Sequence, residues 1–337
     1  MDAEKLKLML QPDYVHPELA EILRTGAPVG SLDESTDIHE LRKLLLQRKL
    51  EAAKNADQNL SSKETDVQIP TRDGSQITLR IYQPLEKTNA RAPVLVMLHG
   101  GGWVLGGLEN EQPLCQKWVD EFKGVAINVE YRLAPESKFP VPIYDCHDAV
   151  IWARSHASDY GGDLTAGFIV AGISAGASMA ATVSHLDRDD KNSPPLTGVY
   201  LSIPSLMAPE AVPEKYKSKY LSREQHKDGL IINQKAMKLF RDNYQDDPRS
   251  PLMSPIIWPS GHNNLPRTYF QIAGSDPLRD EGLIYEQILR EDCGIDTKVD
   301  LYPGLPHGFW SWFTSAQFSR EHFKNAVEGL RWLLGKS

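Results

Sequence analysis

The chain has 337 residues, of which 41% are hydrophobic and 24% are charged, a mixture that is typical of a globular protein and excludes a largely disordered chain. Lysine and arginine number 37 against 45 aspartate and glutamate residues, so the formal net charge is −8. An acidic chain of this kind lacks the basic surface that binds nucleic acid or an anionic membrane, and we expect neither as a partner.

The first 60 residues have helical character, with a periodic apolar segment from residue 38 to residue 53. Two strand-like runs follow, at residues 66–70 and 77–84. Asp73 and Gly74 lie between them, and an Asp-Gly pair between two such runs predicts a β-hairpin.

From residue 90 onwards, short apolar runs alternate with helical segments. The expected strands are Val94–Leu98, Val125–Tyr131, Phe168–Gly172, Gly198–Ile203, Thr268–Ala273 and Lys298–Tyr302. The expected helices are Glu111–Phe122, Pro142–Ala157, Ala175–Leu186, Asn233–Asn243, Glu281–Glu291 and about Ser319 to Leu334. Continuous apolar strands separated by helices indicate a parallel sheet covered on both faces. The sequence therefore predicts an α/β fold with an eight-stranded, mostly parallel sheet.

Residues 204–250 interrupt this alternation, because they form a long stretch rich in Pro, Lys and Tyr between two expected strands. Together with residues 1–60 they are predicted to form a helical cap over the C-terminal ends of the strands, where ligands of open α/β sheets bind. The expected organisation is an N-terminal cap segment, 1–60, followed by a main domain, 61–337, with a cap insertion at about 204–250.

A GxSxG motif spans residues 172–176, directly after an apolar strand and directly before a helix that starts with small residues. In this context a serine on a sharp turn projects above the sheet, and glycines flank it because the turn leaves no room for side chains. Ser174 is therefore the candidate nucleophile.

Three glycines follow His99 at the end of another strand, in the run His99 to Trp103. Glycines at a strand end let backbone N–H groups turn toward a cavity, where they can meet a developing oxyanion. A phosphate-binding loop is excluded, since no GxGxxG pattern can be aligned at this position.

A nucleophilic serine needs a base, and the base needs an acid that orients it. Asp276 follows the strand 268–273, and His307 follows the strand 298–302; the other nine histidines lack such a placement. The order serine, acid, histidine matches that of serine hydrolases built on an open α/β sheet. Asp280 and Glu281 are rivals for the acid, although both are expected to enter the next helix.

These motifs together resemble those of the hormone-sensitive-lipase branch of the α/β-hydrolases, the fold-3 carboxylesterases. Their residues are similar to those of fungal members. The resemblance implies an α/β-hydrolase fold with Ser174 as nucleophile, His307 as general base and acid, and Asp276 as its orienter. The motifs that carry it spread over about residues 60–335 and are HGGGW at 99–103, YRLAPE at 131–136, GISAG at 172–176, SDPLRDEG at 275–282 and PHGF at 306–309.

The resemblance also implies an oxyanion hole made by the N–H groups of Gly101, Gly102 and Ala175. One position departs from the family, which usually has an acidic residue before the serine, whereas this chain has Ile173. Ile173 would make the floor beside the nucleophile apolar, and the aromatic residues Trp103 and Phe309 are further candidates for the substrate pocket.

The expected activity is hydrolysis of a small to medium carboxylic ester or lactone, without a metal or an organic cofactor, and with a place in secondary metabolism. An acyltransferase or a lactone-forming cyclase that uses the same three residues is an alternative. A non-catalytic binding protein is a third reading, but the plant gibberellin receptors that resemble this family have lost the histidine, which this chain keeps as His307. The oligomeric state is left open.

The three cysteines are far apart and form neither a CxxC pair nor a metal-ligand spacing, so they are expected to be reduced thiols. The N-terminus carries no apolar stretch of signal-peptide length. Both features favour a cytoplasmic protein.

Overall fold

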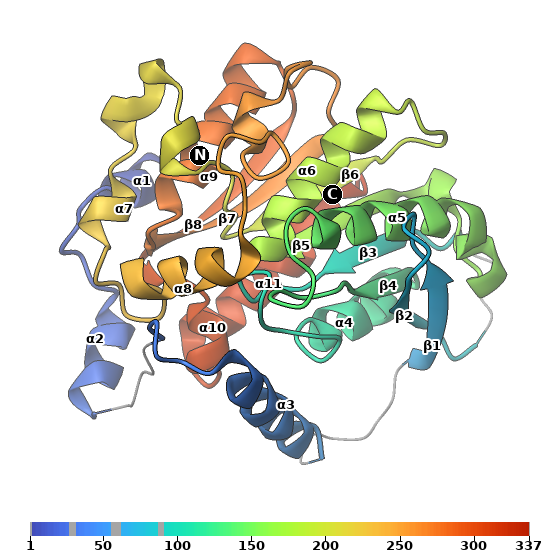
Figure 1. The fold of residues 1–337 in the computed structure, drawn as a ribbon, viewed down its shortest axis with the longest axis horizontal. Coiled ribbons are helices and arrows are strands. Elements are labelled where there is room, and N and C mark those ends of the chain that lie inside the picture. The colour runs from blue at the N-terminus through green and yellow to red at the C-terminus, as the bar shows by residue number, and fades with distance from the viewer. Residues whose placement is uncertain (1, 27–31, 55–61, 87–90, 337) are drawn as a thin grey trace.

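An eight-stranded sheet forms the centre of the structure, a computed structural model that describes residues 2–26, 32–54, 62–86 and 91–336 (Figure 1). The strands follow one another across the sheet in the order β1-β2-β4-β3-β5-β6-β7-β8. Their bounds are β1 Ser62–Pro70, β2 Gln76–Pro84, β3 Val94–Leu98, β4 Val125–Glu130, β5 Phe168–Ile173, β6 Gly198–Ser202, β7 Arg267–Ser275 and β8 Thr297–Pro306.

The strand directions confirm a mostly parallel sheet. β2 runs antiparallel to both of its neighbours, β1 and β4, while all the other neighbouring pairs are parallel. The inner strands β3 and β5 are buried along their whole length, as expected for apolar strands that are covered on both faces. The hairpin predicted from Asp73 and Gly74 joins β1 to β2, and Gly74 has a φ of 83°, a conformation that glycine adopts without strain.

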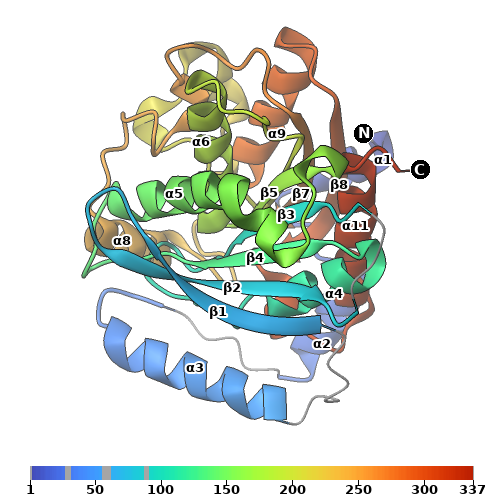
Figure 2. The same ribbon diagram turned by 90° about the vertical axis from the view of Figure 1, so that its right-hand side faces the viewer.

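Helices cover both faces of this sheet (Figure 2). The helices α4 (Gln112–Phe122) and α11 (Gln317–Leu333) contribute their apolar side chains to the core on one face. The helices α5 (Val141–His156), α6 (Ala175–Asp189) and α9 (Arg279–Gln287) contribute theirs to the core on the other face. A π-helical turn over Ile288–Asp292 continues α9 to about the end that the sequence predicts. Within the described ranges, no helix is both long enough and apolar enough to cross a bilayer.

The N-terminal segment holds the helices α1 (Ala3–Met9), α2 (Pro17–Arg24) and α3 (Ile38–Lys54), and residues 1, 27–31 and 55–60 of it lie outside the described residues. Met9 is buried, and the N–H of His16 donates to the carbonyl of Gly304 in β8 at 3.2 Å. From α3, the Arg42 side chain donates to the carbonyl of Val104 at 2.7 Å. The segment therefore packs along the sheet edge and touches the loop that follows β3.

The stretch between β6 and β7 holds short helical turns and the helices α7 (Ser222–Gln225) and α8 (Gln234–Tyr244). A further short helix, α10 (Phe309–Trp312), follows β8. In Figure 1, α7 and α8 lie away from the sheet, on the same side of the molecule as α2.

The register of the strands decides which residues meet at the C-terminal edge of the sheet. Leu98 of β3 lies opposite Gly172 of β5, so the glycine run after β3 and the serine after β5 leave the sheet side by side. Ser275 of β7 lies opposite Pro306 of β8. Asp276 and His307, the residues that come next, are therefore neighbours.

Candidate active site

Ser174 lies on a sharp turn between β5 and α6. Its backbone has φ 53° and ψ −116°, a region that non-glycine residues rarely adopt because the side chain crowds the backbone. A Cβ atom at Gly172 would overlap the carbonyl of Gly176, and one at Gly176 would overlap the carbonyl of Leu98. The flanking glycines of the motif are thus required by the close approach of β5, α6 and the end of β3.

Ser174, His307 and Asp276 form a hydrogen-bonded line. The Oγ of Ser174 lies 2.8 Å from Nε2 of His307, and Nδ1 of His307 lies 2.8 Å from Oδ2 of Asp276. The second carboxylate oxygen of Asp276 accepts the N–H of Leu278 at 2.8 Å, which fixes the carboxylate plane. Asp276 is only 1% exposed and His307 only 7% exposed. In this geometry an imidazole can take the serine proton while the carboxylate stabilises the resulting imidazolium.

The loop after β3 turns back on itself beside the serine. Gly101 and Gly102 have φ values of 131° and 61°, so both positions favour glycine. The carbonyl of Gly101 accepts the N–H of Leu105 at 2.8 Å, which closes the turn. Ala175 is the first residue of α6, where backbone N–H groups have no acceptor inside the helix. The three residues predicted to donate to an oxyanion are therefore brought to the same edge as Ser174.

His99 supports this loop rather than facing the serine. Its ring stacks on Tyr131 with the centroids 4.0 Å apart, and its Nδ1 lies 2.9 Å from the carbonyl of Gly100. The hydroxyl of Tyr131 donates to the carbonyl of His99 at 2.8 Å. These contacts hold the backbone just before the glycine pair in one conformation.

Comparison with known proteins places this site in a family. A model of the alpha/beta hydrolase fold matches residues 95–311, which include the serine, the acid and the histidine. The chain belongs to the α/β-hydrolases. Within them it falls in the hormone-sensitive-lipase-like branch, as the sequence motifs predict.

Three relatives show the kind of activity. The versiconal hemiacetal acetate esterase of Dothistroma septosporum is 35% identical over 272 residues, which are 80% of this chain and 82% of that protein. The structure of a vibralactone cyclase has a TM-score of 0.87 and 30% identity, and 95% of each chain is covered. An esterase of Pyrobaculum calidifontis has a TM-score of 0.81 and 29% identity over 95% of this chain and 99% of the other. The chain is an esterase-type α/β-hydrolase, a carboxylic ester hydrolase.

The three residues predicted to line the substrate pocket of this esterase differ in their packing. Ile173 is 7% exposed and lies beneath the backbone of Gly100. Trp103 stacks on Tyr244 of α8, with the ring planes 2° apart and the centroids 4.9 Å apart. Phe309 has no exposed surface, because it packs against the rings of Tyr302 and Phe318, so in this structure it offers no face to a ligand. Contact of Ile173 or Trp103 with substrate stays a prediction.

The two rivals for the acid, Asp280 and Glu281, both lie in the first turn of α9 and contact other residues. Asp280 accepts the N–H groups of Leu221 and Ser222, each at 2.7 Å, and Glu281 accepts the N–H of Leu206 at 2.7 Å. Both carboxylates therefore bind the cap insertion. The sequence analysis missed this role. The signal that could have shown it is a run of charged residues in the first turn of a helix that begins at the end of a buried strand, where a carboxylate needs a partner.

His226 is a second residue that the sequence left without a role. It lies in the insertion with its Nε2 3.3 Å from Nη1 of Arg279, which also donates to the carbonyl of Met9 at 2.9 Å. Burial, and then the Arg279 cation, lower the pKa of His226, so the imidazole is neutral and accepts this hydrogen bond. Arg279 thereby joins the N-terminal segment and the insertion behind Asp276.

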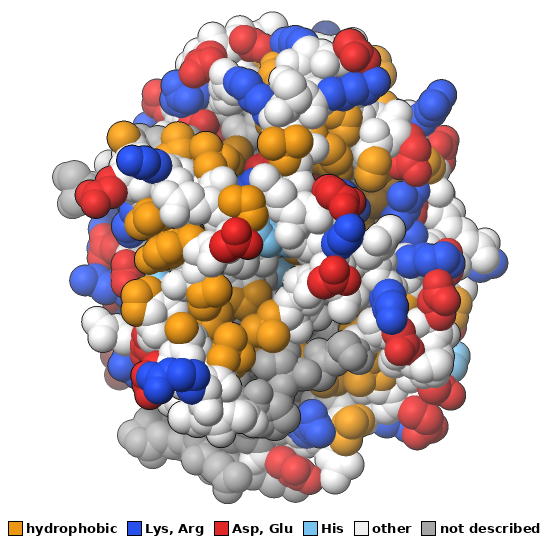
Figure 3. All heavy atoms as spheres, turned by 90° about the vertical axis from the view of Figure 1, so that its left-hand side faces the viewer, with side chains coloured by type: hydrophobic (Ala, Val, Ile, Leu, Met, Phe, Trp, Pro, Cys, Tyr) orange, Lys and Arg blue, Asp and Glu red, His pale blue; other side chains and the backbone are white. Residues whose placement is uncertain are grey.

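The face of the molecule that carries α2, α7 and α8 is shown in Figure 3. Hydrophobic side chains gather on it, and histidine atoms are visible between them. Charged side chains lie around and among them.

Proposed function

We propose that the protein hydrolyses a small to medium carboxylic ester or lactone through an acyl-enzyme formed on Ser174. The observation that carries the proposal is the hydrogen-bonded line from Ser174 through His307 to Asp276, with both distances at 2.8 Å. A receptor-like role without catalysis has no need of this line, which a nucleophile, its base and the orienting acid do need.

The reaction follows from the geometry. Ser174 Oγ attacks the carbonyl carbon while Nε2 of His307 takes the hydroxyl proton. The oxyanion accepts hydrogen bonds from backbone N–H groups at Gly101, Gly102 and Ala175, which lie beside the serine and cost no reorganisation. The C–O bond to the alcohol then breaks, and the alcohol leaves with the proton from His307. A water molecule, deprotonated by the same imidazole, attacks the acyl-enzyme and frees the acid and Ser174.

A metabolite bearing an acetate ester or a lactone ring, of the kind found in secondary metabolism, is the substrate class we favour. The names of two similar proteins support it, since one is a versiconal hemiacetal acetate esterase and the other a vibralactone cyclase. The second also supports an alternative function, in which a hydroxyl of the substrate replaces water and closes a lactone on the same residues. Product analysis with an added alcohol or amine distinguishes the two, because acyl transfer gives a new ester or amide and hydrolysis gives only acid.

The N-terminal segment, 1–60, and the insertion at about 204–250 form the cap in this proposal, and the main domain carries the reacting groups. Two contacts with the loop after β3 support this. Tyr244 of α8 stacks on Trp103, and Arg42 of α3 donates to the carbonyl of Val104. We also place the protein in the cytoplasm, because all three cysteines are unpaired thiols, which a reducing compartment preserves.

We expect the purified protein to hydrolyse 4-nitrophenyl acetate and butyrate, and a small organophosphonate to stop the reaction by labelling Ser174. EDTA and a thiol-alkylating reagent should leave the rate unchanged, because the proposed steps use neither a metal nor a thiol and two of the cysteines are buried. Rate assays and a peptide mass map of the labelled protein test this. Inactivation by EDTA that a divalent ion reverses would contradict the proposal.

Ile173 is expected to set a preference for apolar acyl groups. Ile173→Asp, which brings in the acidic residue usual in the family, should lower kcat/KM for hexanoate roughly tenfold more than for acetate, because a carboxylate beside the acyl chain must be desolvated. Ile173→Val is the matched control, since it keeps an apolar surface at the same place. Equal losses on both esters would show that Ile173 only packs.

A further inference from the structure

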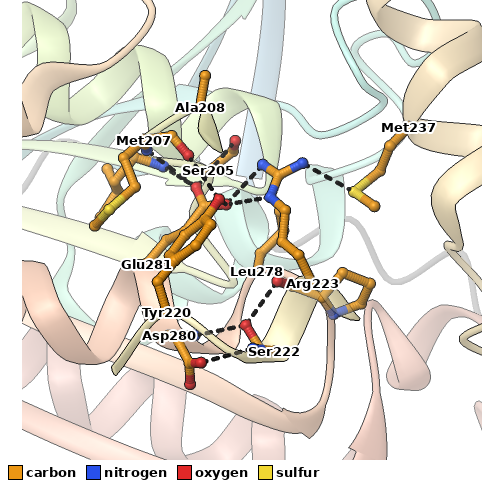
Figure 4. A network of polar contacts seen from close by, with 12 residues as sticks. Ser205, Met207, Ala208, Tyr220, Ser222, Arg223, Met237, Leu278, Asp280 and Glu281 are labelled. Atoms are coloured by element: carbon orange, nitrogen blue, oxygen red, sulfur yellow. Dashed lines mark hydrogen bonds and ion pairs between the residues drawn. The ribbon is translucent and has the colours of Figure 1, made fainter. Parts of the chain in front are cut away.

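Two carboxylates in the first turn of α9 bind the cap insertion through hydrogen bonds at two separate places (Figure 4). Asp280 holds one of them, the start of α7, through the N–H groups of Leu221 and Ser222. The hydroxyl of Ser222 in turn donates to the carbonyl of Pro277 at 2.8 Å. Since Pro277 directly follows Asp276, the insertion is anchored one residue from the carboxylate that holds His307.

Glu281 holds the second place and is fully buried. Its Oε2 accepts the N–H groups of Leu206 and Met207 at 2.7 and 3.0 Å, where the insertion leaves β6. Its Oε1 accepts Nε and Nη2 of Arg223 at 2.9 and 2.6 Å, and the hydroxyl of Tyr220 at 3.2 Å. Both oxygens are thus occupied by donors that belong to the insertion. Charge-assisted hydrogen bonds in a buried site are strong, so this carboxylate fixes the relative positions of its partners.

Arg223 passes this anchoring on to α8. Its Nη1 lies 3.4 Å from the sulfur of Met237, the fourth residue of that helix. Further along α8, the ring of Phe240 covers Gly102 so closely that a Cβ there would lie 2.5 Å from it. A chain of contacts therefore runs from the start of α9, next to Asp276, through Glu281, Arg223 and α8, to the loop proposed to bind the oxyanion.

The backbone at the start of the insertion is strained, which shows how firmly it is held. Ile203 has a φ of 44°, a conformation that is rare for a β-branched residue. Such a residue persists only where the surrounding structure over-determines it. The N–H of Ile203 donates to the carbonyl of Gln271 at 2.8 Å, and Glu281 binds the chain three and four residues later.

We propose that Glu281 and Arg223 are positioning residues that seat α8 against the loop 101–103 and so set the size of ester that the site accepts. The inference rests on the proposed function, because the position of α8 affects ester size only if Trp103, which stacks on Tyr244 of α8, lines the acyl side of the substrate pocket. Glu281 contacts neither His307 nor Ser174 among its hydrogen bonds, so its effect falls on the wall of the site and not on the proton transfers.

The experiment compares Glu281→Gln, Arg223→Met and the double variant. Glutamine keeps an acceptor for Leu206 and Met207 but turns an NH₂ group toward Arg223, while methionine keeps much of the volume of arginine without its charge. We expect the KM for 4-nitrophenyl hexanoate to rise about tenfold in each variant. The KM for 4-nitrophenyl acetate and the rate at which a small organophosphonate labels Ser174 should each change less than threefold. In the double variant the KM for hexanoate should rise no further than in the single variant with the higher KM, because the two residues act as one unit.

A second buried ion pair provides the matched control. Arg154 of α5 and Asp187 of α6 are 9% and 2% exposed, and Asp187 lies about 18 Å along α6 from its first residue, Ala175. Arg154→Met and Asp187→Asn should lower the melting temperature to a similar extent and leave the ratio of the two KM values unchanged. If this pair changes the ratio as much as Glu281→Gln does, the effect is one of general stability and the inference is wrong. A parallel fall in Ser174 labelling would equally overturn it.

Hydrogen–deuterium exchange separates this inference from the proposed function. In Glu281→Gln, without any substrate, exchange at residues 205–207 and 234–244 should speed up at least tenfold, while the control pair leaves it unchanged. If wild-type protein hydrolyses no ester, the proposed function fails, and the exchange result still decides whether Glu281 seats α8. Unchanged exchange over both segments would refute the positioning role.

Discussion

Ser174→Ala and His307→Ala are each expected to lower kcat for ester hydrolysis on the order of 10⁶-fold, and the double variant to be barely worse than either. The reason is that the two residues act as one unit: without the imidazole the hydroxyl keeps its proton, and without the hydroxyl the imidazole has nothing to activate. The 2.8 Å hydrogen bond between them is the geometry that such a unit requires.

Steady-state turnover of 4-nitrophenyl acetate and butyrate measures this effect, together with circular-dichroism melting curves. Ser174→Ala should melt close to the wild-type temperature, because it removes only one part-buried hydrogen bond, that of the serine hydroxyl to His307. Substantial activity in Ser174→Ala, after removal of any contaminating wild-type enzyme, would show that the nucleophile lies elsewhere. Losses that multiply in the double variant would show that the two residues act independently.

The main features of the fold could be predicted because they depend on local patterns. Val94–Leu98 is apolar throughout and became the inner strand β3 with the predicted bounds, since a strand covered on both faces has only buried positions. The serine turn could be predicted for a similar reason, because the glycines at 172 and 176 are demanded by close contacts within a few residues. Asp276 and His307 were found because each directly follows a strand at the same sheet edge.

Other features depend on contacts between distant segments, which no local pattern reveals. The segment 38–53 shows a helical apolar repeat, yet Leu44 and Leu50 are exposed in α3, so the repeat predicts the helix but not the face that packs. Phe309 follows His307 closely in sequence, but its side chain turns into the core. The partners of Glu281 lie about 60 to 75 residues away in the chain, in a segment with no regular pattern.

The choice of acid illustrates the same limit and leads to the second large effect. Asp276, Asp280 and Glu281 lie within six residues, and spacing alone cannot say which carboxylate faces the histidine. Backbone conformation decides: Asp276 stands before α9 begins, opposite the end of β8, whereas the other two lie in the first turn of the helix and face the insertion. Only Asp276 has an oxygen within hydrogen-bonding distance of His307.

Asp276→Asn is therefore expected to lower kcat on the order of 10⁴-fold, because an amide opposite Nδ1 favours the wrong tautomer and cannot stabilise the imidazolium. Asp280→Asn should lower kcat less than tenfold. Its cost should appear instead in the free energy of unfolding, by about 3 kcal/mol, since the change leaves the buried Arg279 without its ion-pair partner. Turnover of 4-nitrophenyl acetate and urea unfolding, measured on both variants, separate the two roles. A larger loss of kcat in Asp280→Asn than in Asp276→Asn would mean that Asp280 is the acid that serves His307 in solution. A large loss of kcat in both variants, with an unchanged free energy of unfolding, would mean that Asp276 and Asp280 both act on the imidazole. Neither carboxylate alone would then be the residue that orients His307.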